Sequence, residues 1–356
     1  MTTRELWLNI MHYGKFDRMP VIHWEIWAET KERWSHEGLA KDANPHKYLN
    51  AVPMYYIIEP YIELYPGFEE EKLDESDEWV IMRDGKGVIS KSWKNRSCIP
   101  QYLDHTLKDA SNWDEYKRRL QPNAERLPKS LDGLIAEAEN SGLPIAIWTG
   151  AMMGWIRDWM GVENMAYLMY DSPDTYADMV DTISDLVVWM LDQVLPRMKI
   201  KPDMGFGWED ICGKTGPLVS PWLFDRLVAP GYRKIRAKLD EYGVPLYGID
   251  TDGDIEALAG HWLEAGVNVQ FPVEIGTWNG DPMKLRKKYG RELRIIGGFN
   301  KLTLEKGPRA IDEEIERRIP LMKEGGFVIQ PDHFIQPGVS LENYKYYLER
   351  IRGLRF

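Results

Sequence analysis

Short apolar runs alternate with helical patterns along most of this 356-residue chain, and this alternation limits its fold more than any other feature. Buried apolar strands joined by amphipathic helices are typical of parallel βαβ units. The chain has about eight such runs, which predicts an α/β fold with a single (β/α)8 barrel over residues 1–356. The expected strands are residues 21–25, 55–59, 144–150, 203–208, 245–249, 267–273, 293–296 and 327–330.

One part of the chain departs from this alternation. Residues 79–83 and 88–92 have a strand pattern, and they flank Asp84-Gly85-Lys86-Gly87, a strong signal for a tight turn. We therefore expect a β-hairpin inserted into the barrel at about residues 78–93. No internal repeat or linker divides the remaining sequence, so we expect no second domain.

The composition excludes several classes of protein. The net charge is −11, and no cluster of Lys and Arg indicates binding to nucleic acid or to a membrane surface. Cys98 and Cys212 are the only cysteines, too few for a disulfide framework or an all-cysteine zinc site. The N-terminus lacks the apolar segment of a signal peptide, and no run of about 18 apolar residues occurs. We expect a soluble, cytoplasmic protein.

Acidic residues and histidines follow several of the expected strands. The active site of a (β/α)8 barrel lies at the C-terminal ends of its strands, so these side chains are expected to meet. The strand-end residues are His23, Glu25, Glu59, Trp148, Thr149, Trp208, Glu209, Asp210, Asp250, Asp252, Asp254, Glu274, Asn300, Lys301, Asp332 and His333.

Some of these residues also have a plain structural explanation. Asp254 is placed to cap the helix expected next, and Asp210 to form an ion pair with a nearby basic side chain. A lone histidine such as His333 is more often a satisfied, half-buried residue than a ligand. Among the fifteen tryptophans, Trp148 and Trp208 lie at strand ends and are the better candidates for a pocket.

A set of short motifs runs through nearly the whole chain. They include Phe16-Asp17-Arg18-Met19-Pro20, Trp208-Glu209-Asp210, Gly297-Gly298-Phe299-Asn300-Lys301 and Pro331-Asp332-His333. In these motifs the sequence resembles the uroporphyrinogen decarboxylase superfamily, which implies a (β/α)8 barrel. True uroporphyrinogen decarboxylases carry an arginine-containing segment after the first strand that binds a polycarboxylate. Here that place reads His23-Trp24-Glu25-Ile26-Trp27-Ala28, without arginine, so we do not expect uroporphyrinogen as the substrate.

The sequence also resembles the other branch of the superfamily, the cobalamin-dependent methyltransferases. These bind zinc through His-x-Cys on one strand and a Cys on a later strand, and the corresponding positions here are Asp250, Asp252 and His333. Carboxylate and imidazole ligands leave a metal a harder Lewis acid than thiolates do, which suits an ether oxygen. The resemblance to O-demethylase methyltransferases implies methyl transfer from a small O-methylated compound, and the strand-end tryptophans favour an aromatic one.

The resemblance implies a role for each candidate residue. Zinc, or alternatively Mn²⁺ or Mg²⁺, is held by Asp250, Asp252 and His333, with Glu209 as a candidate fourth ligand. Cobalamin arrives on a partner corrinoid protein. Two alternatives stay open: a decarboxylase or other lyase of the same superfamily, and a non-catalytic barrel that binds a small molecule. The candidate catalytic residues are Glu209, Glu274 and Asp332, and the candidate substrate-binding residues are His23, Glu25, Trp148, Trp208 and Asn300.

Overall fold

The centre of the molecule is a curled parallel sheet of seven strands. The structure is a computed structural model that describes residues 1–95 and 98–356. The strand order is β1-β6-β7-β10-β11-β12-β13, and every neighbouring pair is parallel. The predicted α/β class is confirmed, and the curled sheet is compatible with a TIM-type barrel. The strands are β1 (Tyr56–Ile58), β6 (Ile145–Trp148), β7 (Met204–Trp208), β10 (Leu246–Asp250), β11 (Val269–Phe271), β12 (Arg294–Phe299) and β13 (Phe327–Pro331).

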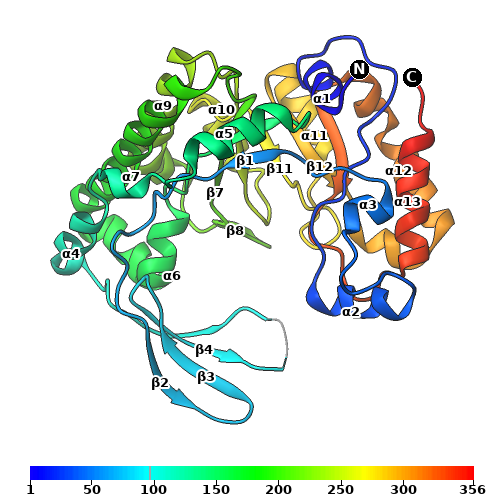
Figure 1. The fold of residues 1–356 in the computed structure, drawn as a ribbon. Coiled ribbons are helices and arrows are strands. Elements are labelled where there is room, and N and C mark those ends of the chain that lie inside the picture. Colours follow the sequence, from blue (N-terminus) through cyan, green and yellow to red (C-terminus); the bar gives the residue numbers. More distant parts are fainter. Residues whose placement is uncertain (96–97) are drawn as a thin grey trace.

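Helices connect the strands and lie around the outside of the sheet (Figure 1). The longer helices bury an apolar stripe at helical spacing, as Met179, Ile183 and Met190 do in the long helix α7. Among the described residues, none of the helices is both long and apolar enough to span a bilayer. The α-helices are α1 (Thr3–Met11), α2 (Ala28–His36), α3 (Pro45–Leu49), α4 (Trp113–Arg119), α5 (Leu131–Asn140), α6 (Gly154–Asp171), α7 (Pro173–Val194), α8 (Pro221–Leu223), α9 (Ala229–Glu241), α10 (Ala259–Glu264), α11 (Pro282–Tyr289), α12 (Pro308–Glu324) and α13 (Leu341–Gly353).

The register of the central strands decides which side chains face the inside of the curl. Gly248 of β10 is paired with Phe206 of β7, and a Cβ on Gly248 would lie 2.9 Å from the Phe206 ring. Phe206 in turn contacts the rings of Tyr55 and Phe271, so this face is the inner one. Side chains alternate along a strand, so Asp250 lies on the same inner face, at the C-terminal end of β10.

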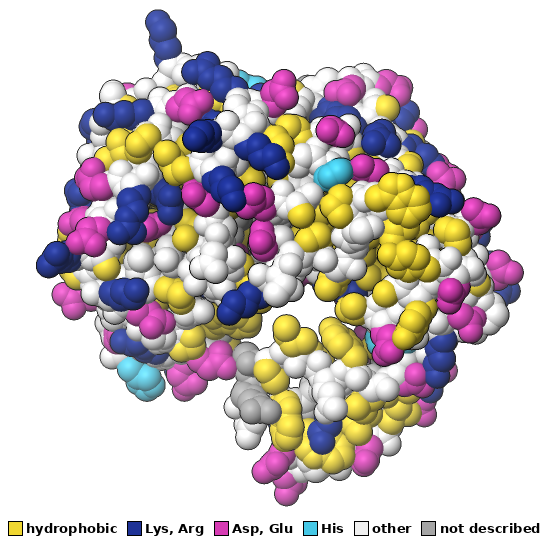
Figure 2. All heavy atoms as spheres, turned by 180° about the vertical axis from the view of Figure 1, so that it is seen from behind, with side chains coloured by type: hydrophobic (Ala, Val, Ile, Leu, Met, Phe, Trp, Pro, Cys, Tyr) yellow, Lys and Arg dark blue, Asp and Glu magenta, His cyan; other side chains and the backbone are white. Residues whose placement is uncertain are grey.

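The chain between β1 and β6 contains a separate antiparallel sheet of four strands, β2 (Glu71–Glu75), β3 (Trp79–Arg83), β4 (Val88–Trp93) and β5 (Gln101–His105). β3 and β4 pair across the turn Asp84–Gly87, and β2 and β5 flank them, so this sheet is wider than the predicted pair. This sheet extends away from the rest of the molecule (Figure 1), and in the view from behind hydrophobic side chains line part of an opening beside it (Figure 2).

The predicted first strand, residues 21–25, is not a strand. Ile22 forms a single parallel bridge with Val52, and Ile26 forms another with Ile335. Because the backbone bonds at the two ends of this segment go to different neighbours, no ladder of consecutive pairs develops. Val52 lies before β1 and Ile335 lies after β13, so residues 21–27 bridge the segments that flank the two edge strands of the sheet.

Candidate functional site

Four carboxylates and a histidine converge beyond the C-terminal ends of the strands. Asp250 is the last residue of β10, and Asp252 follows in the next loop. Asp210, Glu274 and His333 follow β7, β11 and β13 in the same way. Two groups form, Asp252–Glu274–His333 and Asp210–Asp250–Asp252, and in each group one potential ligand atom per residue lies within 4.8 Å of the others. Asp252 belongs to both groups.

The first group joins three different strand ends. His333 Nε2 lies 3.2 Å from Asp252 Oδ2, and both side chains are partly exposed, at 22% and 32%. Glu274 is buried, and one of its oxygens accepts a 3.3 Å hydrogen bond from the amide of Gly253. Gly253 has φ +91°, a conformation that favours glycine, and it sets the turn that carries Asp252 towards Glu274.

The second group concentrates negative charge. The Asp252 amide donates a 3.0 Å hydrogen bond to Asp210 Oδ1, which holds the two loops together. Burial, and then the carboxylates of Asp210, Asp252 and Glu274, raise the pKa of Asp250 well above its ordinary value. Burial and Asp252 raise the pKa of Asp210 in the same direction. A bound cation would relieve this repulsion and favour the charged carboxylates.

The donor set fits a hard or borderline divalent ion. Carboxylate oxygens and imidazole nitrogen are ligands for Zn²⁺, Mn²⁺ and Mg²⁺. Two ligand atoms about 2.1 Å from one ion are at most about 4.2 Å apart, so only small side-chain movements separate the observed spacing from a coordinated one. Of the three ligands predicted from the sequence, Asp252 and His333 share a group, while Asp250 groups with Asp252 and Asp210.

Glu274 also forms a buried ion pair. Lys301 Nζ lies 2.6 Å from Glu274 Oε1, and the two side chains are only 4% and 2% exposed. Burial and the charge of Asp252 raise the pKa of Glu274, whereas Lys301 lowers it. A buried carboxylate without a partner would be costly, so Lys301 allows Glu274 to stay charged beside Asp252.

Asp332 holds the loops around the site. Its side chain is fully buried and accepts hydrogen bonds from the amides of Ile275 (2.6 Å), Gly276 (3.3 Å) and Lys301 (2.8 Å). Burial raises the pKa of Asp332, and the amides oppose that shift. These contacts fix the segment after Glu274 and the start of the segment that carries Lys301.

Glu209 has a similar position at another loop. Its two oxygens accept hydrogen bonds from the amides of Met152, Met153 and Gly154, at 2.5–3.3 Å, and from the hydroxyl of Tyr232. The carboxylate therefore lies at the N-terminus of α6, where amide donors are free. Burial raises the pKa of Glu209 to about 7, and Tyr232 and the amides oppose the shift. Glu209 is in neither of the two convergent groups.

The candidate substrate-binding residues are spread over the site and its surroundings. His23 is buried, and its Nδ1 lies 2.9 Å from the hydroxyl of Tyr344 on α13. Glu25 is exposed, and partial desolvation of its carboxyl raises its pKa. Asn300 accepts a 3.0 Å bond from the amide of Leu302 and caps the following turn. Trp148 and Trp208 are partly buried on the inner face, and Arg157 lies 5.1 Å above the Trp208 ring.

Aromatic rings that the sequence did not single out surround His333. Trp27 stacks on the imidazole at 6.0 Å between ring centroids, and Trp24 lies edge-on at 6.3 Å. Phe334 contacts both tryptophans. Lys301 was among the strand-end residues expected from the sequence, because it lies just after β12, but the sequence assigned it no role.

Comparison with known proteins places this geometry in a family. The sequence matches uroporphyrinogen decarboxylase (URO-D) over residues 95–354. The chain belongs to the uroporphyrinogen decarboxylase family. A curated relative, the uroporphyrinogen decarboxylase of Syntrophotalea carbinolica, is 24% identical over 235 residues, which cover 64% of this chain and 62% of that protein. A solved structure of a methyltransferase from Methanosarcina mazei has the same fold, with a TM-score of 0.63 and 17% identity over 99% of this chain and 98% of the other.

The contacts of Glu209 generate a prediction about stability. A Glu209→Gln substitution places an amide group against backbone amide donors, so buried hydrogen bonds are lost. The free energy of unfolding should fall by about 1–3 kcal/mol, measured by urea denaturation. Glu264→Gln, at an exposed position of α10, serves as the matched control and should change it little. Equal stability of both variants would show that the Glu209 charge does not hold α6.

The burial of His23 generates a prediction about pH. Burial, and then His46, lower the pKa of folded His23 from 6.5 to about 4, so the unfolded chain takes up a proton first as the pH falls. The free energy of unfolding should therefore fall as the pH decreases from 6.5 to 4, and the His23 contribution to this fall should reach about 2 kcal/mol by pH 5. His23→Asn, measured by denaturation at pH 7.5 and 5, should reduce this dependence, whereas exposed His36→Asn should not. The same pH dependence in both variants would contradict the assignment.

Proposed function

We propose that this protein transfers a methyl group from a small O-methylated compound to the Co(I) of a corrinoid carried by a separate protein. A divalent metal ion would assist the reaction. The observation that carries this proposal is the group Asp252–Glu274–His333, in which two carboxylates and an imidazole from three strand ends come within ligand distance of one another. These are hard ligands at the end of a curled parallel sheet, where enzymes of this architecture have their active sites.

The metal ligands we propose are Asp252, His333 and Glu274, with Asp250 next to them in the second group. A zinc ion bound there would act as a Lewis acid on an ether oxygen. Glu274 would supply charge, Lys301 would keep that charge in place when the metal is absent, and Asp332 would hold the loop. Glu209 accepts hydrogen bonds from three amides at the start of α6 and from the Tyr232 hydroxyl. We therefore propose that it positions this helix.

The aromatic rings around His333 support an aromatic methyl donor. Trp24, Trp27 and Phe334 offer flat apolar surfaces beside a proposed ligand. A ring stacked there would place a methoxy oxygen near the acidic groups. Partly buried Trp148 and Trp208 lie on the same inner face and would close the other side of the pocket.

The architecture we propose is a (β/α)8 barrel in which residues 21–27 take the place of the eighth strand, because they bridge the segments next to both edge strands. The four-stranded sheet β2–β5 would then be an insertion between β1 and β6. The corrinoid would approach the C-terminal ends of the strands on its own carrier protein, in the cytoplasm. The methyltransferase from Methanosarcina mazei shares this fold along its length, and its name supports methyl transfer as the proposed reaction.

Decarboxylation is the second candidate, because a curated relative is named a uroporphyrinogen decarboxylase. The charge around the site weighs against a substrate with many carboxylates. Asp210, Asp250, Asp252 and Glu274 gather there, and the buried Lys301 is already paired with Glu274. A polyanion would meet repulsion from these groups.

Metal binding tests the proposed ligands. The metal-free protein should bind Zn²⁺ in calorimetry, and Asp252→Asn or His333→Gln should weaken binding at least about tenfold, because each removes a ligand. Asp254→Asn is the matched control, since its carboxylate accepts from the Glu256 amide and lies outside both groups. A wild-type protein that binds no divalent ion, or variants that bind as well as the control, would overturn the metal site.

Methyl transfer tests the reaction. With a Co(I) corrinoid carrier and a panel of methoxylated aromatic compounds, the metal-loaded protein should produce methylated corrinoid, followed by its absorption spectrum. Asp252→Asn should lower the rate at least about a hundredfold, or about 2.7 kcal/mol in the barrier. Release of CO2 from carboxylic acids, with no methylated corrinoid formed from any donor, would favour the decarboxylase instead.

A further inference from the structure

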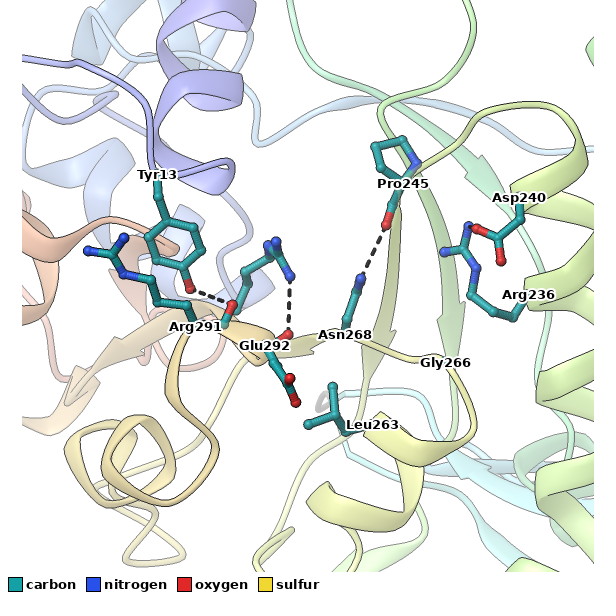
Figure 3. Close-up of a pocket in the computed structure, with 10 residues that line it drawn as sticks. Tyr13, Arg236, Asp240, Pro245, Leu263, Gly266, Asn268, Arg291 and Glu292 are labelled. Atoms are coloured by element: carbon teal, nitrogen blue, oxygen red, sulfur yellow. Dashed lines mark hydrogen bonds and ion pairs between the residues drawn. The ribbon is translucent and has the colours of Figure 1, made fainter.

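A second cavity lies at the opposite end of the sheet from the acidic groups. It has a volume of about 540 Å³ and is bordered by the N-terminal ends of β10, β11 and β12 (Figure 3). Asp250 ends β10 at its other tip, so this cavity is separate from the proposed methyl-transfer site. Three arginines line it, Arg236, Arg291 and Arg294, and two carboxylates, Asp240 and Glu292, lie beside them.

Guanidinium groups gather around one aromatic ring beside this cavity. The guanidinium carbons of Arg291, Arg286 and Arg294 lie 4.9, 5.5 and 5.5 Å from the ring centroid of Tyr13. The Tyr13 hydroxyl donates a 2.9 Å hydrogen bond to the carbonyl of Arg291, as Figure 3 shows. Tyr13 has φ 58°, an uncommon value for a residue with a side chain. The backbone thus holds the ring where three like charges meet.

This cluster is short of negative charge. Glu324 lies 3.2 Å from Arg286 and 3.6 Å from Arg291, and it is the only carboxylate paired with these three arginines among the described residues. Arg294 donates to the backbone carbonyls of Met11 and Glu292. Such bonds hold a guanidinium in place and are a structural reason for the arginine. Because carbonyl groups are dipoles without net charge, they do not neutralise the guanidinium.

Arg236 adds donors on the other side of the cavity. One nitrogen of its guanidinium, Nη2, donates to Asp240 and to the carbonyl of Val244. Its Nε and Nη1 are buried and have no hydrogen-bond partner among the described residues. Buried donors without a partner are costly, and after a small movement of this side chain an anion in the cavity would supply acceptors for them.

We propose that this cavity binds a small organic anion that carries a phosphate group. Arginine forks match the oxygens of phosphate, and the excess positive charge lies within a chain whose net charge is −11. The cavity is much larger than inorganic phosphate, and Pro245 and Leu263 on its wall offer apolar surface for the organic part of the ligand. This site is independent of the proposed methyl transfer.

Binding of phenyl phosphate and of inorganic phosphate to the full chain tests this proposal, by calorimetry at ionic strength matched with chloride. We expect both to bind, with phenyl phosphate tighter because its ring reaches the apolar wall. Arg294→Gln and Arg291→Gln should each weaken phenyl phosphate at least about tenfold. Arg291 is 65% exposed, so its substitution keeps the fold even where that of Arg294 does not.

The matched control is Arg309→Gln, whose side chain is 92% exposed on α12 and should leave binding unchanged. Arg294→Lys keeps the charge but not the fork and should retain part of the affinity. The proposal is overturned if neither phosphate compound binds the wild-type chain beyond the chloride control. It is also overturned if Arg291→Gln binds as tightly as Arg309→Gln.

Discussion

Buried carboxylates that accept backbone amides hold the loops at the C-terminal end of the sheet. Asp332 joins the loop after β11 to the one after β12, and Glu209 joins the end of β7 to the start of α6. Each carboxylate satisfies several amides that would otherwise be buried without a partner, a large cost in a closed loop. Because these two carboxylates fix the loops, Asp252, Glu274 and His333 approach one another from three different strand ends.

The acidic residues of the strand ends therefore divide into two kinds. Asp332 and Glu209 each accept several hydrogen bonds from backbone amides. Asp210, Asp250 and Asp252 face one another, and burial and mutual repulsion raise the pKa of Asp250 and Asp210. Folding brings these like charges together at a cost, and a bound cation is the simplest way in which that cost would be recovered.

The sequence was informative about strands and less so about loops. Apolar runs and glycines were enough to predict the parallel sheet, because their pattern is local. Residues 21–25 also have a strand pattern, but they form only isolated bridges, since their pairing depends on two edges distant in the sequence. Their position at strand ends identified Asp252 and His333 as candidates. The same position could not distinguish Glu274, which lies close to both, from Asp332, which is bonded to backbone amides. That difference depends on which amides the loops present, and no local pattern encodes it.

The two ends of the sheet carry opposite charge for different physical reasons. The carboxylates at the C-terminal end approach one another across several loops, and within residues 1–95 and 98–356 only Glu274 among them has a buried cationic partner, Lys301. At the N-terminal end, arginines such as Arg294 bond to carbonyls at the ends of chain segments and keep their charge. A metal ion bound at the C-terminal end of the sheet would thus interact little with an anion bound at the N-terminal end. The separation allows one chain to hold both without either ligand neutralising the site of the other.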